Sequence, residues 1–388
     1  MYNKKVYWVC LQQALGIGNH KIKDIIENFG TIENLFKASK DEWRFSNIFT
    51  SKELNDLKKI DLKWAEKIVS ECDNCGYKIV TFEDNLYPER LKNIYNPPAV
   101  LYVKGNLDYI DDCVCISIVG TRSATQYGLN VAFDFGYKLS KAGVVVISGG
   151  ALGIDSAAQK GAVLAGGKVV SVLGCGLNTN YLMKNKLLRD VISKNGALVS
   201  EYLPDKTALP QNFPMRNRII SGLSLGTLIV EAGSKSGSLI TANLTLEQNK
   251  DLFAVPGDIK SAKSVGTNRL IKECAKLVTS VEDILEEYYC VCPQEKISTK
   301  EEINKEILNN IKESKKDSID LSGRVLDDKI KSLSERAKVF YSNLTDRPLH
   351  IDELAQSCHM KTSEALQAVT ELELKNLIKS NPGKRYSR

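Results

Sequence analysis

The sequence predicts an α/β protein built around a Rossmann-like, mostly parallel sheet with helices on both faces. Short apolar runs rich in β-branched residues alternate with amphipathic stretches of helical length, and glycines stand where the helices should stop. The first 75 and the last 53 residues carry helical patterns instead. We therefore expect a small helical domain of the SAM or helix-hairpin-helix kind, then the sheet, then a C-terminal winged helix.

The composition supports a folded chain of several domains. Of the 388 residues, 43% are hydrophobic and 26% are charged, both close to globular averages. Residues 291–335 hold 19 charged groups in 45 positions, which is typical of a solvated linker. We expect four parts: a helical domain at 1–75, a Rossmann-like core at 76–290, a charged linker at 291–335 and a winged helix at 336–388.

The N-terminal helical segment contains a glycine turn, Leu15-Gly16-Ile17-Gly18-Asn19-His20, between two helical stretches. In helix-hairpin-helix units such glycine amides face a nucleic-acid phosphate. The alternative is a small packing domain with a glycine turn. The sequence leaves both interpretations open.

The central region contains the runs that we expect to form the sheet. Each run is apolar, and stretches of about 10 to 17 residues with helical periodicity separate them. The expected strands are Val114–Val119, Val144–Ser148, Lys168–Leu173, Ala197–Ser200, Thr227–Val230 and Leu252–Val255.

The turn after the first of these strands is the first candidate binding site, because ligands of open parallel sheets bind beyond the carboxyl ends of the strands. Its sequence is Gly120-Thr121-Arg122-Ser123. It offers a glycine for close backbone approach, two hydroxyls, a forked cation and the free amides of the next helix. This combination favours a phosphate, and the alternative is a plain turn with an exposed arginine.

A second turn is rich in glycine and contains Ser148, Gly149, Gly150 and Gly153. It is typical of a nest of backbone amides that binds an anion, with Asp155 as a cap or a polar contact. Neither the G-x-G-x-x-G fingerprint nor the Walker pattern occurs, so nicotinamide chemistry and ATP hydrolysis lose support.

A third cluster places Arg216, Asn217 and Arg218 beside the aromatic Phe213. Cations suit a phosphodiester backbone, and an aromatic face suits an unstacked base. The alternative is an amphipathic helix whose arginines pair with carboxylates. The cluster becomes more specific in company with another glycine and hydroxyl turn, which contains Ser236 and Gly237.

Catalysis finds little support in the sequence. No histidine occurs between residues 21 and 349, so a histidine base has no place in the core. Glu201 and Glu231 are available for acid–base chemistry, but such carboxylates more often orient arginines or cap helices. We expect no catalytic residue and no cofactor.

Charge and cysteine content exclude other classes. The net charge of +6 is spread along the chain, so nucleic-acid binding has to come from a local cluster. The close cysteine pairs lie far from the three histidines, and we expect neither a metal nor a disulfide. No stretch resembles a membrane span or an export signal, and we expect a cytoplasmic protein without membrane contact. The pairs are Cys72 and Cys75, Cys113 and Cys115, and Cys290 and Cys292.

Taken in order, the clusters resemble the bacterial DNA-processing protein A family, also called DprA or Smf. Such an ordered series over nearly 200 residues is highly specific. The motifs that carry the resemblance include Tyr87-Pro88, Pro97-Pro98, Gly120-Thr121-Arg122, Ser148-Gly149-Gly150, Ser200-Glu201, Phe213-Pro214, Arg216-Asn217-Arg218, Ser236-Gly237-Ser238, Pro256-Gly257 and Gly266-Thr267-Asn268.

The resemblance implies a homodimer that binds single-stranded DNA and loads the RecA recombinase onto incoming strands in natural transformation. Single-strand-binding protein is a further implied partner, which the chain displaces or bypasses. The family's phosphate-contacting turns and arginine cluster fall on the residues given above, with Phe213 as the base-stacking ring. Ile271 and Leu277 are candidates for the dimer surface, although an internal core helix explains them nearly as well.

Two further expectations concern the C-terminal segment and an alternative function. The predicted recognition helix, residues 362–373, carries Glu364, Glu371 and Glu373 and no arginine, which would repel phosphates. Protein contact or weak DNA contact fits it better than operator reading. The alternative to a DNA-binding mediator is a nucleotide-processing enzyme, such as a nucleoside-monophosphate phosphoribohydrolase that uses Glu231 near a phosphate-binding turn.

Overall fold

The structure is a computed structural model that describes residues 2–181, 183–289, 333–344, 349–358, 360–374, 378–381 and 385–387. Two compact units, Met1–Thr299 and Lys300–Arg388, make up the chain. Most of the expected linker lies outside the described residues, as do Cys290 and Cys292. The four-part division expected from the sequence stays a prediction.

The first unit contains a nine-stranded sheet of order β1-β2-β6-β5-β4-β3-β7-β8-β9. All neighbouring strands in the stretch β6-β5-β4-β3-β7-β8-β9 are parallel. Beside β6, the strands β2 and β1 add an antiparallel edge. The expected mostly parallel α/β fold is therefore confirmed, and each of the six expected strands lies within one residue of its observed bounds. The strands are β1 (Lys78–Thr81), β2 (Val100–Gly105), β3 (Cys115–Val119), β4 (Val145–Ser148), β5 (Val169–Leu173), β6 (Ala197–Ser200), β7 (Gly226–Ile229), β8 (Asp251–Ala254) and β9 (Lys276–Leu277).

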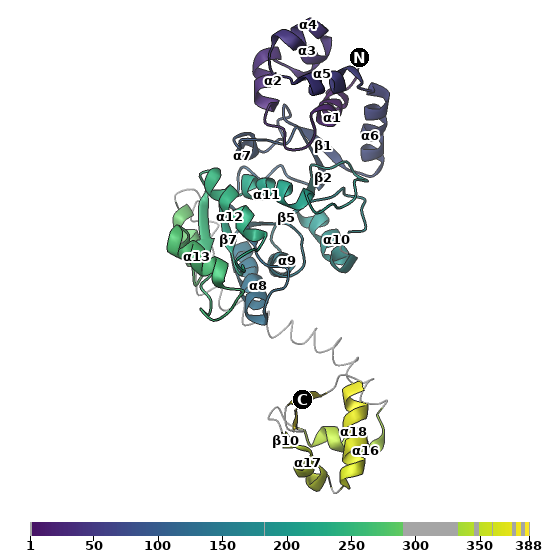
Figure 1. Ribbon diagram of the computed structural model, residues 1–388, viewed down its shortest axis with the longest axis vertical. Coiled ribbons are helices and arrows are strands. Elements are labelled where there is room, and N and C mark those ends of the chain that lie inside the picture. The colour runs from purple at the N-terminus through teal and green to yellow at the C-terminus, as the bar shows by residue number, and fades with distance from the viewer. Residues whose placement is uncertain are drawn as a thin grey trace. The chain divides into compact units, whose positions relative to one another are not determined.

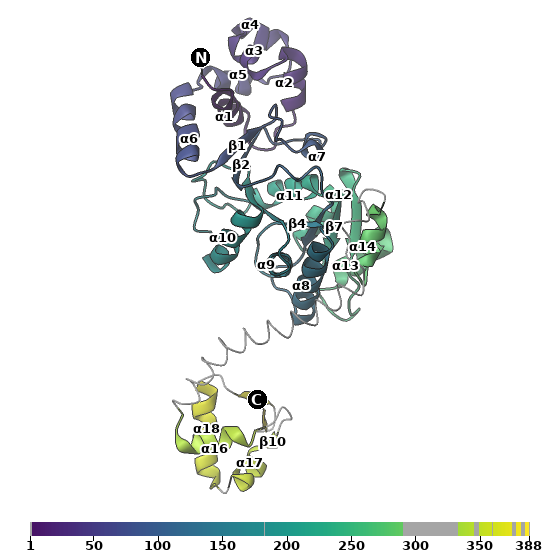
Figure 2. The same cartoon turned by 180° about the vertical axis from the view of Figure 1, so that it is seen from behind.

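Helices cover both faces of this sheet, which is why its strands are apolar on both sides. Along β3, Cys115 and Val119 belong to one hydrophobic core, and Ile116 and Ile118 belong to the other. The first face holds α7 (Glu89–Lys92), α11 (Asn212–Leu223), α12 (Ser238–Glu247) and α13 (Val265–Glu273). The second face holds α8 (Gln126–Lys141), α9 (Ile154–Leu164), α10 (Lys186–Asn195) and α14 (Glu282–Leu285), all labelled in Figure 2.

The strand order creates a crevice at the centre of the sheet. From β3 the chain adds β4, β5 and β6 on one side, and it then returns to add β7, β8 and β9 on the other. The order therefore reverses between β3 and β7. In sheets of this type the ligand site lies beyond the carboxyl ends of the strands at such a reversal.

Six short helices precede the sheet and gather beside β1 and β2 (Figure 1). Their apolar side chains share one core with Ile79, Val100 and Tyr102 of these strands. Gln12 links the two parts, because its amide donates to the Glu201 carbonyl at 3.0 Å and accepts from the Tyr102 hydroxyl at 3.2 Å. The helices are α1 (Lys4–Leu15), α2 (Ile22–Phe29), α3 (Ile32–Lys37), α4 (Lys40–Phe45), α5 (Ser51–Lys58) and α6 (Leu62–Asn74).

The N-terminal glycine turn joins α1 to α2 and faces another helix. Gly16 and Gly18 have φ angles of 79° and 75°, in the left-handed region that glycine tolerates. A Cβ at Gly18 would lie 2.4 Å from the Met215 Cε atom of α11. This contact favours the packing interpretation of the turn, and contact with a nucleic-acid phosphate stays a prediction.

The second unit contains the expected winged helix. Its helices are α16 (Glu335–Ser342), α17 (Ile351–Ser357) and α18 (Thr362–Leu374), and its small sheet has the order β10-β12-β11. On α18, Glu364 lies 3.2 Å from Arg336, and Glu371 accepts hydrogen bonds from Ser334. The strands are β10 (Leu349–His350), β11 (Lys379–Asn381) and β12 (Arg385–Ser387).

None of the helices in the described ranges is long and apolar enough to cross a membrane.

Candidate nucleic-acid interface

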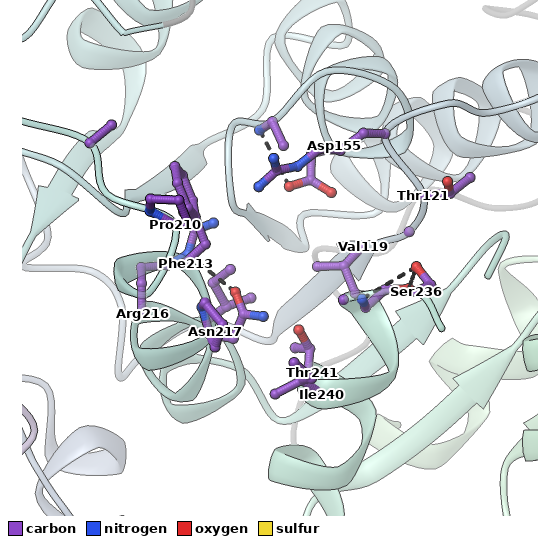
Figure 3. A pocket seen from close by; sticks show the side chains of 18 of the residues that line it. Val119, Thr121, Asp155, Pro210, Phe213, Arg216, Asn217, Ser236, Ile240 and Thr241 are labelled. Carbon is purple, nitrogen blue, oxygen red and sulfur yellow. Dashed lines mark hydrogen bonds between the residues drawn. The ribbon is translucent and has the colours of Figure 1, made fainter. Parts of the chain in front are cut away.

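A cavity of about 610 Å³ opens at the crevice between the ends of β3 and β7. This volume lies within the range of small-ligand sites. Figure 3 shows Phe213 and Asn217 of α11 on one side, with Thr121 and Ser236 on the other. Segments far apart in the sequence therefore meet at one place: the turns after β3, β4 and β7, the loop after β5 and the start of α11.

The turn after β3 is held close to its neighbours. A Cβ at Gly120 would lie 2.6 Å from the Ile154 side chain and 2.9 Å from the Glu231 carbonyl, so only glycine fits without a shift. The Thr121 amide donates to the same carbonyl at 2.8 Å. Ser123 does not line the cavity; its hydroxyl accepts from the Lys263 ammonium at 2.5 Å.

Arg122 and Arg216 meet at the Phe213 ring. The exposed Arg122 guanidinium lies 4.9 Å from the ring centroid, and the Arg216 guanidinium lies 5.9 Å from it. Both distances are within the range of cation–π attraction. Tyr181 adds a second ring 5.3 Å from Phe213, at an angle of 41°. Two cations and two aromatic rings thus border one cavity.

Arg216 is itself almost fully buried, with 4% of its surface exposed. It donates to the Gly149 carbonyl at 2.8 Å, to the Val172 carbonyl, and to the Asn217 side chain at 3.3 Å. Loss of water around the guanidinium lowers the pKa of Arg216, and the nearby Asp155 carboxylate opposes this shift. Arg216 therefore contributes a buried positive charge beneath the cavity, whereas Arg122 is the exposed cation.

The second glycine turn holds a carboxylate of its own. The Gly149 and Ala151 amides donate to the Asp155 side chain at 3.1 and 3.4 Å. Burial raises the pKa of Asp155, although Arg216 and these amides act in the opposite direction. An external phosphate would compete with this carboxylate for the two amides.

The other members of that turn serve the packing around it. The Ser148 hydroxyl is fully buried and donates to the Ile118 carbonyl at 2.6 Å. Gly150 and Gly153 have φ angles of 64° and 82°, and a Cβ at Gly153 would lie 2.4 Å from the Thr121 carbonyl. Glycine at position 153 thus lets the first and second turns touch.

Arg218 points away from the cavity. Its side chain is 3% exposed, and it donates to both oxygens of the equally buried Glu201 at 2.6 and 2.8 Å. This is the carboxylate pairing that the sequence left open as an alternative. Arg218 is therefore paired in the interior and does not line the cavity.

Asn217 lines the cavity, and the turn after β7 supplies its opposite wall. Ser236 and Gly237 border the cavity, and the Ser236 and Ser238 hydroxyls lie 2.8 Å apart. The Ser238 amide at the start of α12 donates to the Ser236 hydroxyl at 3.4 Å. Because Gly237 and Ser238 line the cavity, the positive end of this helix borders it.

Glu231, the candidate catalytic carboxylate of the enzyme alternative, is buried and occupied. It accepts from the Thr125 amide at 2.9 Å and from the Thr125 hydroxyl at 2.5 Å. The Thr125 hydroxyl in turn accepts from Gly128 and caps α8. These bonds give Glu231 a structural role at the start of the helix.

The structure thus sorts the predicted site residues into two groups. Those that line the cavity are Gly120, Thr121, Arg122, Phe213, Arg216, Asn217, Ser236 and Gly237. Those that lie elsewhere are Ser123, Ser148, Gly149, Gly150, Gly153 and Arg218. Sequence reasoning missed Tyr181 as a lining residue, because in this chain leucine follows it where the family has proline. It also missed Lys263 as a neighbour of the first turn, because Lys263 belongs to no recognisable motif.

The two predicted dimer-surface residues lie near the β9 edge of the sheet. Leu277 of β9 is 46% exposed, whereas Ile271 of α13 packs partly against the core. Within the described ranges, no group of three or more His, Cys, Asp or Glu side chains is arranged to hold a metal ion.

Two protein-family models match this chain. The family model described as DNA recombination-mediator protein A matches residues 78–289, and the model of the DprA winged helix domain matches residues 329–384. The chain belongs to the DNA recombination-mediator protein A family. The resemblance inferred from the motifs is confirmed.

Individual proteins of the family are also similar to this chain in sequence. DNA processing protein DprA of Bacillus subtilis is 41% identical over 212 residues, which cover 55% of this chain and 71% of the relative. Protein Smf of Synechocystis is 27% identical over 413 residues, which cover 100% of this chain and 99% of the relative. The match with the higher sequence identity therefore covers about half of this chain, and the match over the full chain has lower identity.

Solved structures of the family share this fold. DNA processing protein A of Streptococcus pneumoniae has a TM-score of 0.65 and 34% identity, covering 74% of this chain and 98% of that chain. DNA processing protein A of Helicobacter pylori has a TM-score of 0.50 and 31% identity, covering 54% and 94%. The latter structure was described for its single-stranded DNA binding mode.

Proposed function

We propose that this chain binds single-stranded DNA at the cavity between β3 and β7. The observation that carries the proposal is the exposed Arg122 guanidinium, which lies over Phe213 beside the buried charge of Arg216. A cation serves the phosphodiester, and an aromatic ring serves an unstacked base of any sequence. Membership of the recombination-mediator family and the DNA-binding relative from Helicobacter pylori support the same ligand.

The biological role that fits this ligand is that of a recombination mediator. We propose that the chain loads the RecA recombinase onto single strands during natural transformation, in the cytoplasm, and displaces or bypasses single-strand-binding protein. We further propose that it acts as a homodimer through the surface around Ile271 and Leu277. The exposed Leu277 at the edge of the sheet supports this surface.

We propose no hydrolytic activity for the chain. The bonds from Thr125 to both oxygens of Glu231 support this, because they hold that carboxylate in a structural position at the start of α8. Release of free base from nucleoside monophosphates by the purified protein would overturn this part of the proposal.

The test of the DNA site is the Arg122→Ala variant. Affinity for oligothymidylate is measured by fluorescence anisotropy across a series of salt concentrations. We expect several-fold weaker binding at low salt, and a salt slope smaller by about 0.7, because one phosphate contact on a single strand is lost.

The matched control is Arg44→Ala, which removes an exposed arginine of α4 in the N-terminal helical segment. It changes the net charge equally and should bind as the wild type does. Equal affinity and equal slope in the Arg122 and Arg44 variants would contradict the proposed site.

A further inference from the structure

A second cavity lies on the other side of the turn that follows β3. Its volume is about 470 Å³. The turn from Gly120 to Thr125 separates the two cavities, because Arg122 lines the first and Thr125 lines the second. The lining residues of the second cavity are Thr125, Tyr127, Glu231, Pro256, Gly257, Asp258, Ser261 and Ser264.

Lys263 reaches over this turn from the loop that follows β8. Its ammonium donates to the Ser123 hydroxyl at 2.5 Å, and the Ser123 and Thr121 hydroxyls lie 3.4 Å apart. Of the carboxylates that the structure describes, none lies within ion-pair distance of Lys263. Arg122 of this turn therefore lines the first cavity, and Lys263, which has no acidic partner among the described residues, contacts the turn at Ser123.

Tyr127 offers an aromatic ring at the second cavity. It belongs to the first turn of α8, it is 51% exposed, and its hydroxyl donates to the Pro256 carbonyl at 3.1 Å. The Tyr127 ring therefore lines the second cavity, and an exposed ring at a cavity wall is what base stacking requires.

The charges of the cavity favour a base over a phosphate inside it. The carboxyl groups of Glu231 and Asp258 line it; Thr125 donates to Glu231, and Asp258 accepts from the Lys260 amide at 2.8 Å. A phosphate would be repelled there, whereas an uncharged base would not. The cation for the phosphate stands at the rim, on Lys263.

We propose that Ser123, Lys263 and Tyr127 form a second nucleotide subsite for single-stranded DNA. The phosphodiester binds at the Ser123 hydroxyl and the Lys263 ammonium, and the base enters the second cavity against the Tyr127 ring. The strand then crosses the turn after β3, with nucleotides on both sides of it. This subsite rests on the proposed function, because it extends the same DNA path.

The phosphate part is tested with Lys263→Gln in the full-length chain, again by the salt dependence of oligothymidylate binding. We expect the salt slope to fall by about 0.7 and the affinity at low salt to fall several-fold. Lys260→Gln is the matched control, because Lys260 is an exposed lysine of the same loop. If the two variants have the same slope, Lys263 contacts no phosphate and the subsite is wrong.

The base part is tested with two substitutions of Tyr127. Tyr127→Leu keeps an apolar side chain but removes the ring, and we expect at least about fivefold weaker binding. Tyr127→Phe keeps the ring and loses only the hydrogen bond to Pro256, and we expect affinity near that of the wild type. Equal losses in both variants would overturn base stacking and assign the effect to the hydroxyl.

Failure of this inference can be told apart from failure of the proposed function. If Arg122→Ala weakens binding while the Lys263 and Tyr127 variants bind as their controls do, the first cavity stands and the second subsite falls. If Arg122→Ala binds as the wild type does, the proposed DNA site itself falls.

Discussion

Arg216 and Arg218 stand two residues apart on α11, yet their side chains lie in different surroundings. A helix turns by about 100° per residue, so positions two apart point to nearly opposite sides. Arg216 is directed under the cavity, against the Gly149 and Val172 carbonyls and beside Asp155. Arg218 is directed toward Glu201. One run of basic sequence thus supplies one charge to the site and one to the interior.

The Glu201→Gln variant tests the structural role of Arg218. Removing the charge of one partner leaves the Arg218 guanidinium buried without a counter-charge, which costs about 3 kcal/mol. We expect the free energy of unfolding in urea to fall by this amount. Oligothymidylate affinity of the folded variant should stay at the wild-type value.

The control for this variant is Glu71→Gln, which breaks the exposed ion pair with Lys67 on α6. Exposed pairs of this spacing contribute at most about 0.5 kcal/mol, so its stability should hardly change. If folded Glu201→Gln keeps its stability but loses much of its DNA affinity, Arg218 acts in DNA binding and the structural role is wrong.

At the scale of elements, the contact between α8 and α9 fixes the position of both glycine turns. Each of these helices begins at one of the turns, α8 after residues 120–123 and α9 after residues 148–153. A Cβ at Gly136 of α8 would lie 2.1 Å from the Ala158 carbonyl, and a Cβ at Gly161 of α9 would lie 2.1 Å from the Phe133 carbonyl. The two helix backbones therefore touch, with no side chain between them at these points.

The Gly136→Ala variant tests this contact. The added methyl group has to push α8 and α9 apart, and such overpacking costs about 1–3 kcal/mol. We expect the urea midpoint to fall accordingly. Leu164→Ala, at an exposed position of α9, serves as the control and should stay within about 0.5 kcal/mol of the wild type. Unchanged stability in Gly136→Ala would mean that the helices are free to separate.

The sequence predicts elements better than it predicts contacts between them. The β-branched runs located six strands because buried parallel strands leave a strong apolar signal. The strands β1 and β2 were not predicted, since they form an antiparallel edge outside the repeating pattern. The close approach of α8 and α9 was not predicted either, because a glycine within a helix signals only weaker helix formation until its neighbour is known.

At the scale of the whole molecule, the same distinction holds for the site. Gly120, Arg122, Phe213 and Ser236 could be assigned to one cavity, because their segments all follow or approach the carboxyl ends of parallel strands. The place of Arg218 depends on which side of α11 meets Glu201. The place of Lys263 depends on the path of a loop without a motif, and neither dependence is visible in a single sequence.

The two units of the chain should also unfold separately. The hydrophobic core of the C-terminal unit shares no residue with the three cores of the first unit. All three tryptophans, at positions 8, 43 and 64, belong to the first unit, so tryptophan fluorescence reports on that unit alone. Circular dichroism reports on helices of both units. We therefore expect urea transitions that differ between the two probes.

Phe340→Ala separates the two transitions further. Phe340 is fully buried in the C-terminal core, and its truncation costs about 3–5 kcal/mol there. The part of the circular dichroism change that fluorescence does not follow should move to lower urea, while the tryptophan transition stays in place. A shift of the tryptophan transition together with the dichroism would instead mean that the winged helix and the first unit are stabilised by one another.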